Sequence, residues 1–372
     1  MMRFLRLMNF KKFKDQLIEF RALTLISGLN STGKSSVLQS ILLLRQSYQQ
    51  NLLQNTGLAL NGELANIGTA QDAFFENGKE NYIYFEIAWE SYKGIWSFRY
   101  NPDKKDEDVL NFISEPNNSE IYKSNIFSQY FHYLQAERIG PRSFNKMSDY
   151  QVRRLRQLGT QGEYTAHFLY IYGREPIPIA NLSYPEAKSM DLIDQVEAWM
   201  REVSPGIRIE IKANSEMGLV TIQYFYGDSN RYRATNVGFG ITYTLSIIVA
   251  ILSSYPGTLI LVENPEAHLH PRGQAKMGEL LALAASCGIQ VVIETHSDHV
   301  LNGIRLAVHG GKIKPDDVQL HYFQRQEKQG QAVTKVISPR IYRDGTIDRW
   351  PDGFFDEWER SLDALLEPIN GD

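Results

Sequence analysis

The sequence predicts an α/β fold built around a nucleotide-binding loop, and three observations carry this prediction. The segment 28–36, GLNSTGKSS, matches the pattern G-x-x-x-x-G-K-[ST] at every fixed position. The apolar run at 23–27 predicts a strand before this segment, and 36–44 predicts a helix after it. Two further apolar runs, 259–263 and 290–294, each end in a glutamate, which is typical of strands that deliver an acid to a site at their carboxyl ends.

The residues of the glycine-rich segment suit the binding of a nucleoside triphosphate. Glycine lets successive backbone amides turn toward one phosphate, where a Cβ would collide. Lys34 provides a point charge for the β- and γ-phosphates, and the Ser35 hydroxyl is a ligand for Mg²⁺. The start of the helix adds unpaired amides and a dipole that favour anions. The expected contacts are Asn30, Ser31, Thr32, Gly33, Lys34, Ser35 and Ser36.

The two glutamate-ending runs are joined by 273–285, which has helical periodicity. A strand–helix–strand unit of this kind is parallel and right-handed, so both runs end at the same edge of one sheet. We therefore expect Glu263 and Glu294 at one site.

The apolar stretch 241–262 is about long enough to span a membrane. Pro256-Gly257 interrupts it, however, and Glu263 follows at once. This pattern favours a buried helix, a turn and a buried central strand, and we expect no membrane association.

Composition is that of an ordinary globular protein. Of the 372 residues, 43% are hydrophobic and 22% are charged. The net charge of −4 gives no overall basic field, so binding of nucleic acid would need a local patch or a partner. Cys287 is the single cysteine, which argues against a disulfide framework and favours a reducing cytoplasm. The first residues lack the apolar core of a signal peptide.

Periodicity and turn residues predict the remaining elements. They are strands at 4–10, 17–26 and within 81–100, a loop at 101–125, helices within 145–205, and a hairpin formed by 207–213 and 219–225.

Four segments follow one another along the chain: GLNSTGKSS (28–36), NVGFGITYTL (236–245), LILVENPEAHLHP (259–271) and VVIETHSDH (291–299). Their order resembles the ABC-class ATPases, and most closely the SMC-like and OLD-like branch found in DNA repair and bacterial phage defence. The resemblance implies an α/β ABC-type P-loop ATPase head with an antiparallel β subdomain, a helical insertion and a small C-terminal extension. ATP and Mg²⁺ are the cofactors that it implies.

The resemblance also implies a division of the chain. Residues 1–100, with the P-loop, and 206–310, with the later motifs, form the head. Residues 101–205 form a largely helical insertion, and 311–372 form the extension. The extension is similar to a short C-terminal domain of unknown function attached to some OLD-like ATPases.

Several residues receive roles from the resemblance. Glu263 corresponds to the Walker B carboxylate that organises Mg²⁺, and His296 to the switch histidine that senses the γ-phosphate. Lys11 lies in a loop where SMC-like ATPases often place a basic residue beside the nucleotide. The signature turn, whose amides face the γ-phosphate held by a second subunit, corresponds to Asn236, Gly238 and Gly240.

Two departures from the family pattern affect the chemistry. The usual serine and glycine pair of the signature is not kept. Asn264 occupies the usual position of the catalytic glutamate and cannot accept a proton as a carboxylate does. Glu266 or Glu294 is then the candidate base, and slow turnover is expected.

Three other features have weaker functional interpretations. The clustered histidines at 268, 270, 296 and 299 invite a zinc site, but the resemblance assigns these segments to the nucleotide. The basic runs Arg153–Arg156 and Lys11–Lys14 favour solvated faces over DNA contact. The aromatic, acidic tail at 350–366 favours a helix that packs its aromatic side chains on the core, with a docking site as the alternative.

The implied function is ATP-dependent dimerisation that controls a partner. In one hypothesis the chain is the sensor ATPase of a phage-defence system and holds or releases a separately encoded nuclease or toxin. In the other it is an SMC-like repair ATPase that contacts DNA directly. The acidic pI of about 6.1 and the absence of heptad repeats favour the first. A transporter subunit and a built-in nuclease are disfavoured, the first by the signature and tail, the second by the short segment after His299.

Overall fold

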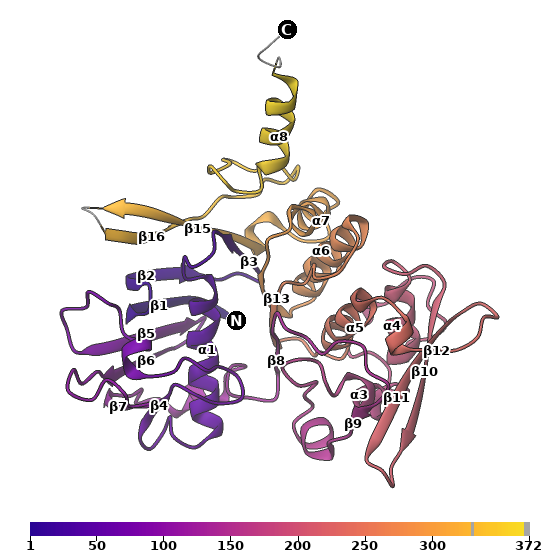
Figure 1. The fold of residues 1–372 in the computed structure, drawn as a ribbon, viewed down its shortest axis with the longest axis horizontal. Coiled ribbons are helices and arrows are strands. Elements are labelled where there is room, and N and C mark those ends of the chain that lie inside the picture. Colours follow the sequence, from indigo (N-terminus) through magenta and orange to yellow (C-terminus); the bar gives the residue numbers. More distant parts are fainter. Residues whose placement is uncertain (329–330, 368–372) are drawn as a thin grey trace.

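A computed structural model describes residues 1–328 and 331–367. Its central sheet has six strands in the order β16-β15-β3-β14-β13-β8 (Figure 1). All but β16 are parallel to their neighbours, and the inner strands are apolar on both faces, as strands covered on both sides must be. The bounds are β3 Leu23–Gly28, β8 Phe131–Leu134, β13 Leu259–Glu263, β14 Gln290–Glu294, β15 Val318–Lys328 and β16 Gln331–Ile337.

A second, antiparallel sheet has the order β2-β1-β5-β6-β7-β4. One hydrophobic core, which includes Leu5, Ile41 and Leu261, joins this sheet to helix α1 and the central sheet. Helix α1 is buried nearly all round because it lies between the two sheets. The bounds are β1 Met2–Phe10, β2 Phe13–Glu19, β4 Gly57–Ala59, β5 Tyr82–Trp89, β6 Lys93–Arg99, β7 Val109–Ser114, α1 Lys34–Gln49 and α2 Ala70–Ala73.

A second core lies on the other side of the central sheet and unites five helices with a small sheet of β9 to β12. The longer bounds are α3 Thr165–Tyr172, α4 Leu192–Met200, α5 Phe239–Leu252, α6 Pro271–Ser286, α7 Asp298–His309, β10 Ile207–Asn214 and β11 Leu219–Tyr226. The short elements are β9 Asn145–Lys146, β12 Tyr232–Arg233, a π-helical turn at Tyr150–Arg154 and 3-10 turns at Ser119–Lys123, Ala180–Leu182, Ala234–Asn236 and Pro315–Asp317.

The parallel pairing of β13 with β14, the α6 crossover and the β10–β11 hairpin confirm the corresponding predictions. The stretch 241–262 is a buried helix followed by a buried strand, as expected. Among the described residues, none of the helices is both long and apolar enough to cross a membrane.

One predicted strand is wrong, because 17–26 is two strands in different sheets. β2 is half-buried and pairs antiparallel with β1, whereas β3 is buried on both faces and belongs to the parallel sheet. The chain changes sheets at 20–22, between β2 and β3, and no glycine or proline marks the boundary in the sequence.

Two of the expected segments contain more strand than the sequence indicated. The range 101–205 holds helices α3 and α4, but also β7, β8 and β9, and β8 is an edge strand of the central sheet. The range 311–372 includes β15, which pairs directly with the P-loop strand β3. The carboxyl-terminal segment therefore helps to build the sheet that carries the nucleotide-binding loop.

The tail beyond this sheet ends in helix α8, Glu357–Leu366, which projects away from the body (Figure 1). Phe354 is fully buried against Tyr322, so the expected packing holds there. It is wrong for α8 itself, which buries none of its residues against the rest of the described chain. Phe355 has a left-handed φ of 54°, and this bend directs the following helix away from the core.

Helices α6 and α7 cross at two glycines, and this contact yields a stability prediction. A Cβ on Gly303 would lie 2.0 Å from the Ala275 carbonyl oxygen, so Gly303→Ala must displace backbone. We expect a loss of about 1–3 kcal/mol, measured as a Tm several degrees lower in thermal unfolding. Gly273→Ala is the control, because its Cβ would make only ordinary contacts, the nearest at 3.7 Å. An equal Tm for both variants would contradict the predicted close approach.

Candidate nucleotide site

The P-loop closes on itself between β3 and α1. The Lys34 ammonium donates hydrogen bonds to the carbonyl oxygens of Gly28 and Leu29, at 3.0 and 2.9 Å. The Thr32 hydroxyl donates to the same Leu29 oxygen at 2.7 Å. Burial lowers the pKa of Lys34, while the nearby charge of Glu294 opposes this shift. The lysine side chain thus lies across the loop.

Glycine is required at two positions of this loop. Gly28 has φ 142°, and a Cβ there would lie 2.2 Å from the carbonyl oxygen of Phe323 on β15. Gly33 has φ 102°, and its Cβ would lie 2.7 Å from the Phe13 ring on β2. Both sheets therefore pack closely against the loop, and neither Gly28 nor Gly33 has room for a side chain.

The other predicted P-loop residues are divided between surface and interior. Asn30, Ser31 and Ser35 are exposed, and Ser31 has the left-handed φ of 62° that turns a loop tightly. Ser36 is buried, and its amide donates to the Gly33 carbonyl oxygen at 3.1 Å.

Two carboxylates meet at the carboxyl edge of the central sheet. Glu263 and Glu294 are register partners at the ends of β13 and β14. The Ser35 hydroxyl lies 3.1 Å from a Glu294 oxygen, and the Lys34 ammonium lies 3.9 Å from the other. Burial, together with the charge of Glu263, raises the pKa of Glu294 to about 7.

Glu263 is held from the opposite side, by residues that the sequence did not indicate. One carboxylate oxygen accepts a hydrogen bond from the Tyr133 hydroxyl at 2.9 Å, and the other from the Ala136 amide at 3.3 Å. Gln135 lies between them at the end of β8, half-buried. In the sequence, Tyr133 and Ala136 are marked only by their position in and just after a short run of mostly apolar residues. They reach the site because β8 pairs with β13, and the sequence does not reveal this pairing.

Arg138 is a second residue that the sequence did not indicate. Its guanidinium donates to the carbonyl oxygens of Glu263 and Asn264 and lies 5.1 Å from the centre of the Tyr243 ring on α5. The side chain is 3% exposed. Asn264 has a left-handed φ of 45°, and its amide donates to the Glu294 carbonyl oxygen at 2.8 Å. Arg138 therefore ties the turn after β13 to helix α5.

Glu266 and His296 lie together on the loops that follow the two strands. Glu266 accepts hydrogen bonds from the Thr295 hydroxyl at 2.7 Å and from the His296 amide at 2.9 Å. Partial burial and the charge of Lys34 lower the pKa of His296, so its imidazole is neutral at pH 7. Both oxygens of Glu266 are engaged, whereas Glu294 faces Ser35.

The predicted signature turn lies at the start of α5. Asn236 and Gly238 are exposed, and a Cβ on Gly238 would meet no described atom within 4 Å. Gly240 is buried, and its Cβ would lie 2.5 Å from the His268 carbonyl oxygen. The two glycines therefore differ: Gly240 is needed for packing within the chain, and Gly238 is not.

Lys11 lies on the turn between β1 and β2 with a left-handed φ of 50°. Its ammonium donates to the Gln39 side chain on α1 at 2.9 Å, and burial lowers its pKa. The β1–β2 turn therefore contacts the helix that begins at the P-loop.

The donor set at this edge of the sheet fits Mg²⁺ with a nucleotide phosphate. Two carboxylates and one hydroxyl are hard oxygen donors of the kind that Mg²⁺ prefers. Burial and the charge of Glu263 raise the pKa of Glu294, and a divalent cation at this position would favour the ionised carboxylate. Among the described residues, no group of three or more His, Cys, Asp or Glu is arranged to hold a metal ion by itself.

Glu294 gives a pH prediction for the protein in EDTA. Its folded-state pKa of about 7 exceeds the usual 4.5, so the folded chain binds this proton more tightly than the unfolded chain. The contribution of Glu294 to stability is therefore lost as the pH rises from about 4.5 to 7. Glu294→Gln should raise the Tm relative to wild type at pH 8, with little gain at pH 5.

Glu279→Gln provides the control of opposite sign. Burial raises the pKa of Glu279, but hydrogen bonds from Lys276 and Lys312 outweigh this effect and lower it. Its removal should reduce the Tm at pH 8. Equal Tm changes for Glu294→Gln at the two pH values would contradict the predicted charge repulsion.

Solved structures that share this fold include head domains of SMC proteins. An SMC head bound to the C-terminal winged-helix domain of ScpA has a TM-score of 0.53 and 16% identity, covering 91% of this chain and 97% of that chain. A Pyrococcus furiosus Smc head with an extended coiled coil, bound to the C-terminal domain of ScpA, has a TM-score of 0.53 and 13% identity. The match covers 98% of this chain and 99% of that chain. A Pyrococcus yayanosii Smc head with a coiled coil and joint has a TM-score of 0.52 and 12% identity. The match covers 92% of this chain and 98% of that chain. These likenesses confirm the predicted fold class.

Comparison with curated protein sequences gives no match. Residues 313–365 match a family described as a protein of unknown function (DUF3696). Residues 23–302, well over half of the chain, match the family described as "AAA domain, putative AbiEii toxin, Type IV TA system". The chain therefore belongs to this AAA-domain family of ATPases.

Proposed function

We propose that the protein binds and hydrolyses ATP and uses ATP-dependent association of two subunits as a switch. The observation that carries the proposal is the exposed turn at Gly238, which begins a buried helix and has open space around it. A helix N-terminus with free amides favours a phosphate, and no described residue of the same chain fills this position. A second copy of the chain, with its own P-loop, supplies the missing phosphate.

The residues of one subunit have distinct tasks in this proposal. Lys34 and the P-loop amides hold the phosphates, and Ser35 with Glu263 holds the cation. Of the two candidate bases, Glu294 is favoured, because its carboxylate faces Ser35, whereas both oxygens of Glu266 already accept hydrogen bonds within the chain. When bound, ATP supplies the γ-phosphoryl group and Mg²⁺ supplies positive charge beside it. The neutral imidazole of His296 donates one hydrogen bond toward the γ-phosphate.

The proposed output is control of a separately encoded effector, a nuclease or toxin, in cytoplasmic antiphage defence. The AbiEii description of the matched family supports this direction. Helix α8 supports it as well, because its apolar side chains form one stripe and are exposed, 69% for Trp358 and 80% for Leu365. The members of the stripe are Trp358, Leu362, Leu365 and Leu366.

Charge indicates what kind of partner surface α8 fits. Acidic side chains border the stripe at Glu357, Glu359 and Asp363, and Arg360 is engaged with Asp352 and Asp356 at the base of the helix. An acidic helix with one apolar stripe is complementary to an apolar groove lined by Lys or Arg. The proposed effector carries such a groove.

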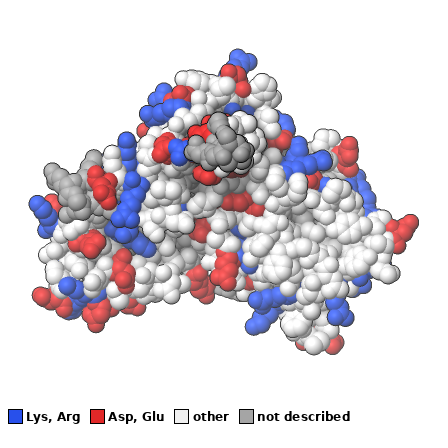
Figure 2. Space-filling model, turned by 45° about the horizontal axis from the view of Figure 1, so that its top comes forward, with Lys and Arg blue, Asp and Glu red and all other residues white. Residues whose placement is uncertain are grey.

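Direct DNA contact is the second candidate function. Arg153 and Arg154 are exposed beside the exposed Tyr150, which suits a phosphate backbone and a base. However, Arg153 is paired with Asp149 at 3.1 Å, which reduces the local positive charge. On the face in Figure 2, positive and negative side chains are interspersed. Loss of salt-sensitive DNA binding in Arg153→Gln/Arg154→Gln would favour this second function.

The switch is tested by light scattering with a non-hydrolysable ATP analogue. Wild type should dimerise at saturating nucleotide, whereas Gly238→Trp should bind the nucleotide but stay monomeric, since its side chain fills the space meant for the second subunit. Lys34→Ala is the control that should lose nucleotide binding at least tenfold, because the charge on the phosphates is gone. A wild type that stays monomeric with bound nucleotide, or a Gly238→Trp variant with unchanged ATPase rate, would overturn the composite site.

The role of α8 is tested with the product of a gene adjacent to this one. Trp358→Ala/Leu365→Ala should lose co-purification of that protein but keep the wild-type Tm, because no described residue covers either side chain. Leu306→Ala, at a leucine 57% exposed on α7, is the matched control and should keep the partner. Retention of the partner by the double variant would remove α8 from the proposal.

A further inference from the structure

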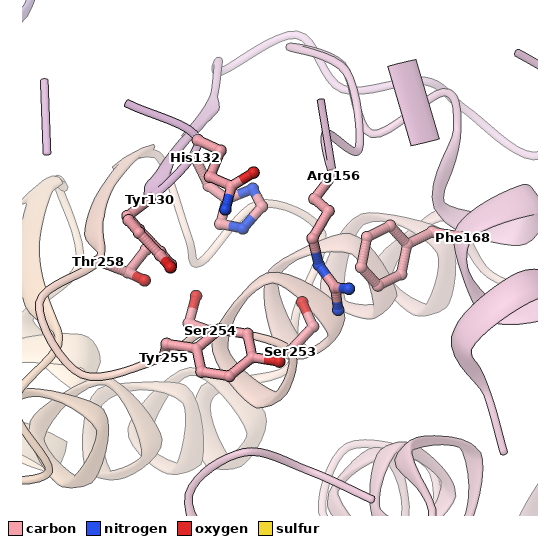
Figure 3. Close-up of a pocket in the computed structure, with 9 residues that line it drawn as sticks. Tyr130, His132, Arg156, Phe168, Ser253, Ser254, Tyr255 and Thr258 are labelled. Carbon is pink, nitrogen blue, oxygen red and sulfur yellow. The ribbon is translucent and has the colours of Figure 1, made fainter. Parts of the chain in front are cut away.

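A cavity of about 270 Å³ lies at the start of β8, at the end of the strand opposite the nucleotide site. Figure 3 shows the residues that line it. Its walls come from the start of β8, the turn after the π-helical segment, α3, and the end of α5 with the loop that leads to β13. Six lining side chains matter for its chemistry: Tyr130, His132, Arg156, Phe168, Tyr255 and Thr258.

Arg156 is separated from its basic neighbours and directed into this cavity. Its left-handed φ of 50° turns the chain at this residue, and the next side chain, Gln157, is anchored to the Phe131 carbonyl oxygen at 2.9 Å. The guanidinium lies 4.3 Å from the centre of the Tyr172 ring and 5.9 Å from that of Tyr255. Contact with the aromatic rings is made through the face of the guanidinium and leaves the N–H groups at its edge available to a ligand.

The donors of Arg156 are not used by the chain. Within the described residues, its guanidinium makes no hydrogen bond, and its one ion pair is with Glu175 at 3.8 Å. The Glu175 side chain is 55% exposed, so water screens this pair. A planar fork of free donors on a cavity wall is suited to bind a carboxylate.

His132 provides a second, independent sign of a ligand. Its side chain is 7% exposed, faces the cavity, and has no hydrogen-bond partner among the described residues. Burial first, and then the charges of Arg45 and Arg156, lower its pKa to about 4. The imidazole is therefore neutral at pH 7 and offers one donor and one acceptor. Its ring nitrogens are therefore available to hydrogen-bond a ligand in the cavity.

The remaining walls are aromatic or offer acceptors. Phe168 is 1% exposed. The rings of Tyr130 and Tyr255 lie edge to face, with their centroids 6.2 Å apart. The hydroxyls of Ser253 and Ser254 donate to carbonyl oxygens of α5, so toward the cavity they act only as acceptors. The cavity thus combines aromatic surface with one cation.

We propose that this cavity binds a small organic anion consisting of one carboxylate on a single aromatic ring. The cavity offers a single positive charge, on Arg156, which already lies near Glu175, while the His132 imidazole is neutral. One positive charge can compensate the charge of a monoanion but not that of a dianion such as a phosphate monoester. The volume is just below the range of drug-sized pockets, which limits the ligand to about one ring. The carboxylate pairs with Arg156, and the ring lies among Phe168, Tyr130 and Tyr255.

Two elements connect this cavity with the nucleotide site. On β8, His132 precedes Tyr133, whose hydroxyl holds Glu263 at 2.9 Å. Helix α5 begins at the Gly238 turn and ends beside the cavity. Occupancy is therefore expected to change ATP turnover at least twofold, and this part rests on the proposed ATPase function.

Binding is tested by ¹⁹F NMR titration of full-length protein with 4-fluorobenzoate, without nucleotide. Saturable broadening is expected for wild type and for the control Arg153→Gln. Arg156→Gln should weaken binding at least tenfold, because a charge-assisted pair is lost. The neutral isostere 4-fluorobenzamide, titrated against wild type, keeps the test valid should the variant fail to fold.

The outcomes separate this proposal from the ATPase proposal. Equal binding of the benzamide and the benzoate, equal affinity in Arg156→Gln, or tighter binding of phenyl phosphate would each overturn the carboxylate site. Phosphate release measured at saturating 4-fluorobenzoate tests the coupling, and an unchanged rate would overturn it. Binding of a fluorescent ATP analogue, measured in parallel, reports the nucleotide site independently.

Discussion

Parallel pairing of β13 with β14 places Glu263 opposite Glu294 at the ends of two buried strands. The raised pKa of Glu294 reflects its burial first and then its repulsion by the charge of Glu263. The surroundings compensate it with Lys34 and Ser35 on one side and with the Tyr133 hydroxyl on the other. The carboxylates and these groups come from β8, β13 and β14 of the same sheet and from α1, the helix that follows β3. The order of strands in the sheet therefore determines which side chains reach the site, and the P-loop, β8 and the two acidic strands form one unit.

The same edge of the sheet is joined to the second lobe through Arg138. Its guanidinium binds two consecutive carbonyl oxygens after β13 and covers Tyr243 on α5. Tyr243 and Phe239 in turn contact the His268 ring, close to where Gly240 meets the His268 backbone. A change in the turn after β13 would thus reach the start of α5 through direct contacts. Such contiguous packing is a physical route for coupling, and kinetic measurements on variants are what establish that it is used.

The sequence was informative where function depends on a short continuous segment. The P-loop, the acid-ending strands and the crossover helix were predicted because each carries its own periodicity or motif. Tyr133 and Arg138 were not, because β8 has four residues and joins the sheet only by pairing with a strand far along the chain. β15 was placed in a separate extension for the same reason, since its pairing with β3 joins residues nearly three hundred positions apart. The periodicity of α8 predicts an apolar stripe but not what covers it, and the packing expected there proved wrong.

Three glycines differ in whether packing within the chain excludes a side chain at their position. At Gly28 and Gly240 a Cβ would lie 2.2 and 2.5 Å from a backbone oxygen, so the fold alone requires glycine at both positions. At Gly238 the backbone is ordinary, with φ −63°, and the space beyond is open. Space within the chain therefore does not require glycine here, although glycine is among the residues preferred at the N-cap position that Gly238 occupies. In the proposed dimer, the phosphate of a second subunit would approach the α5 amides through the space that a larger side chain would occupy.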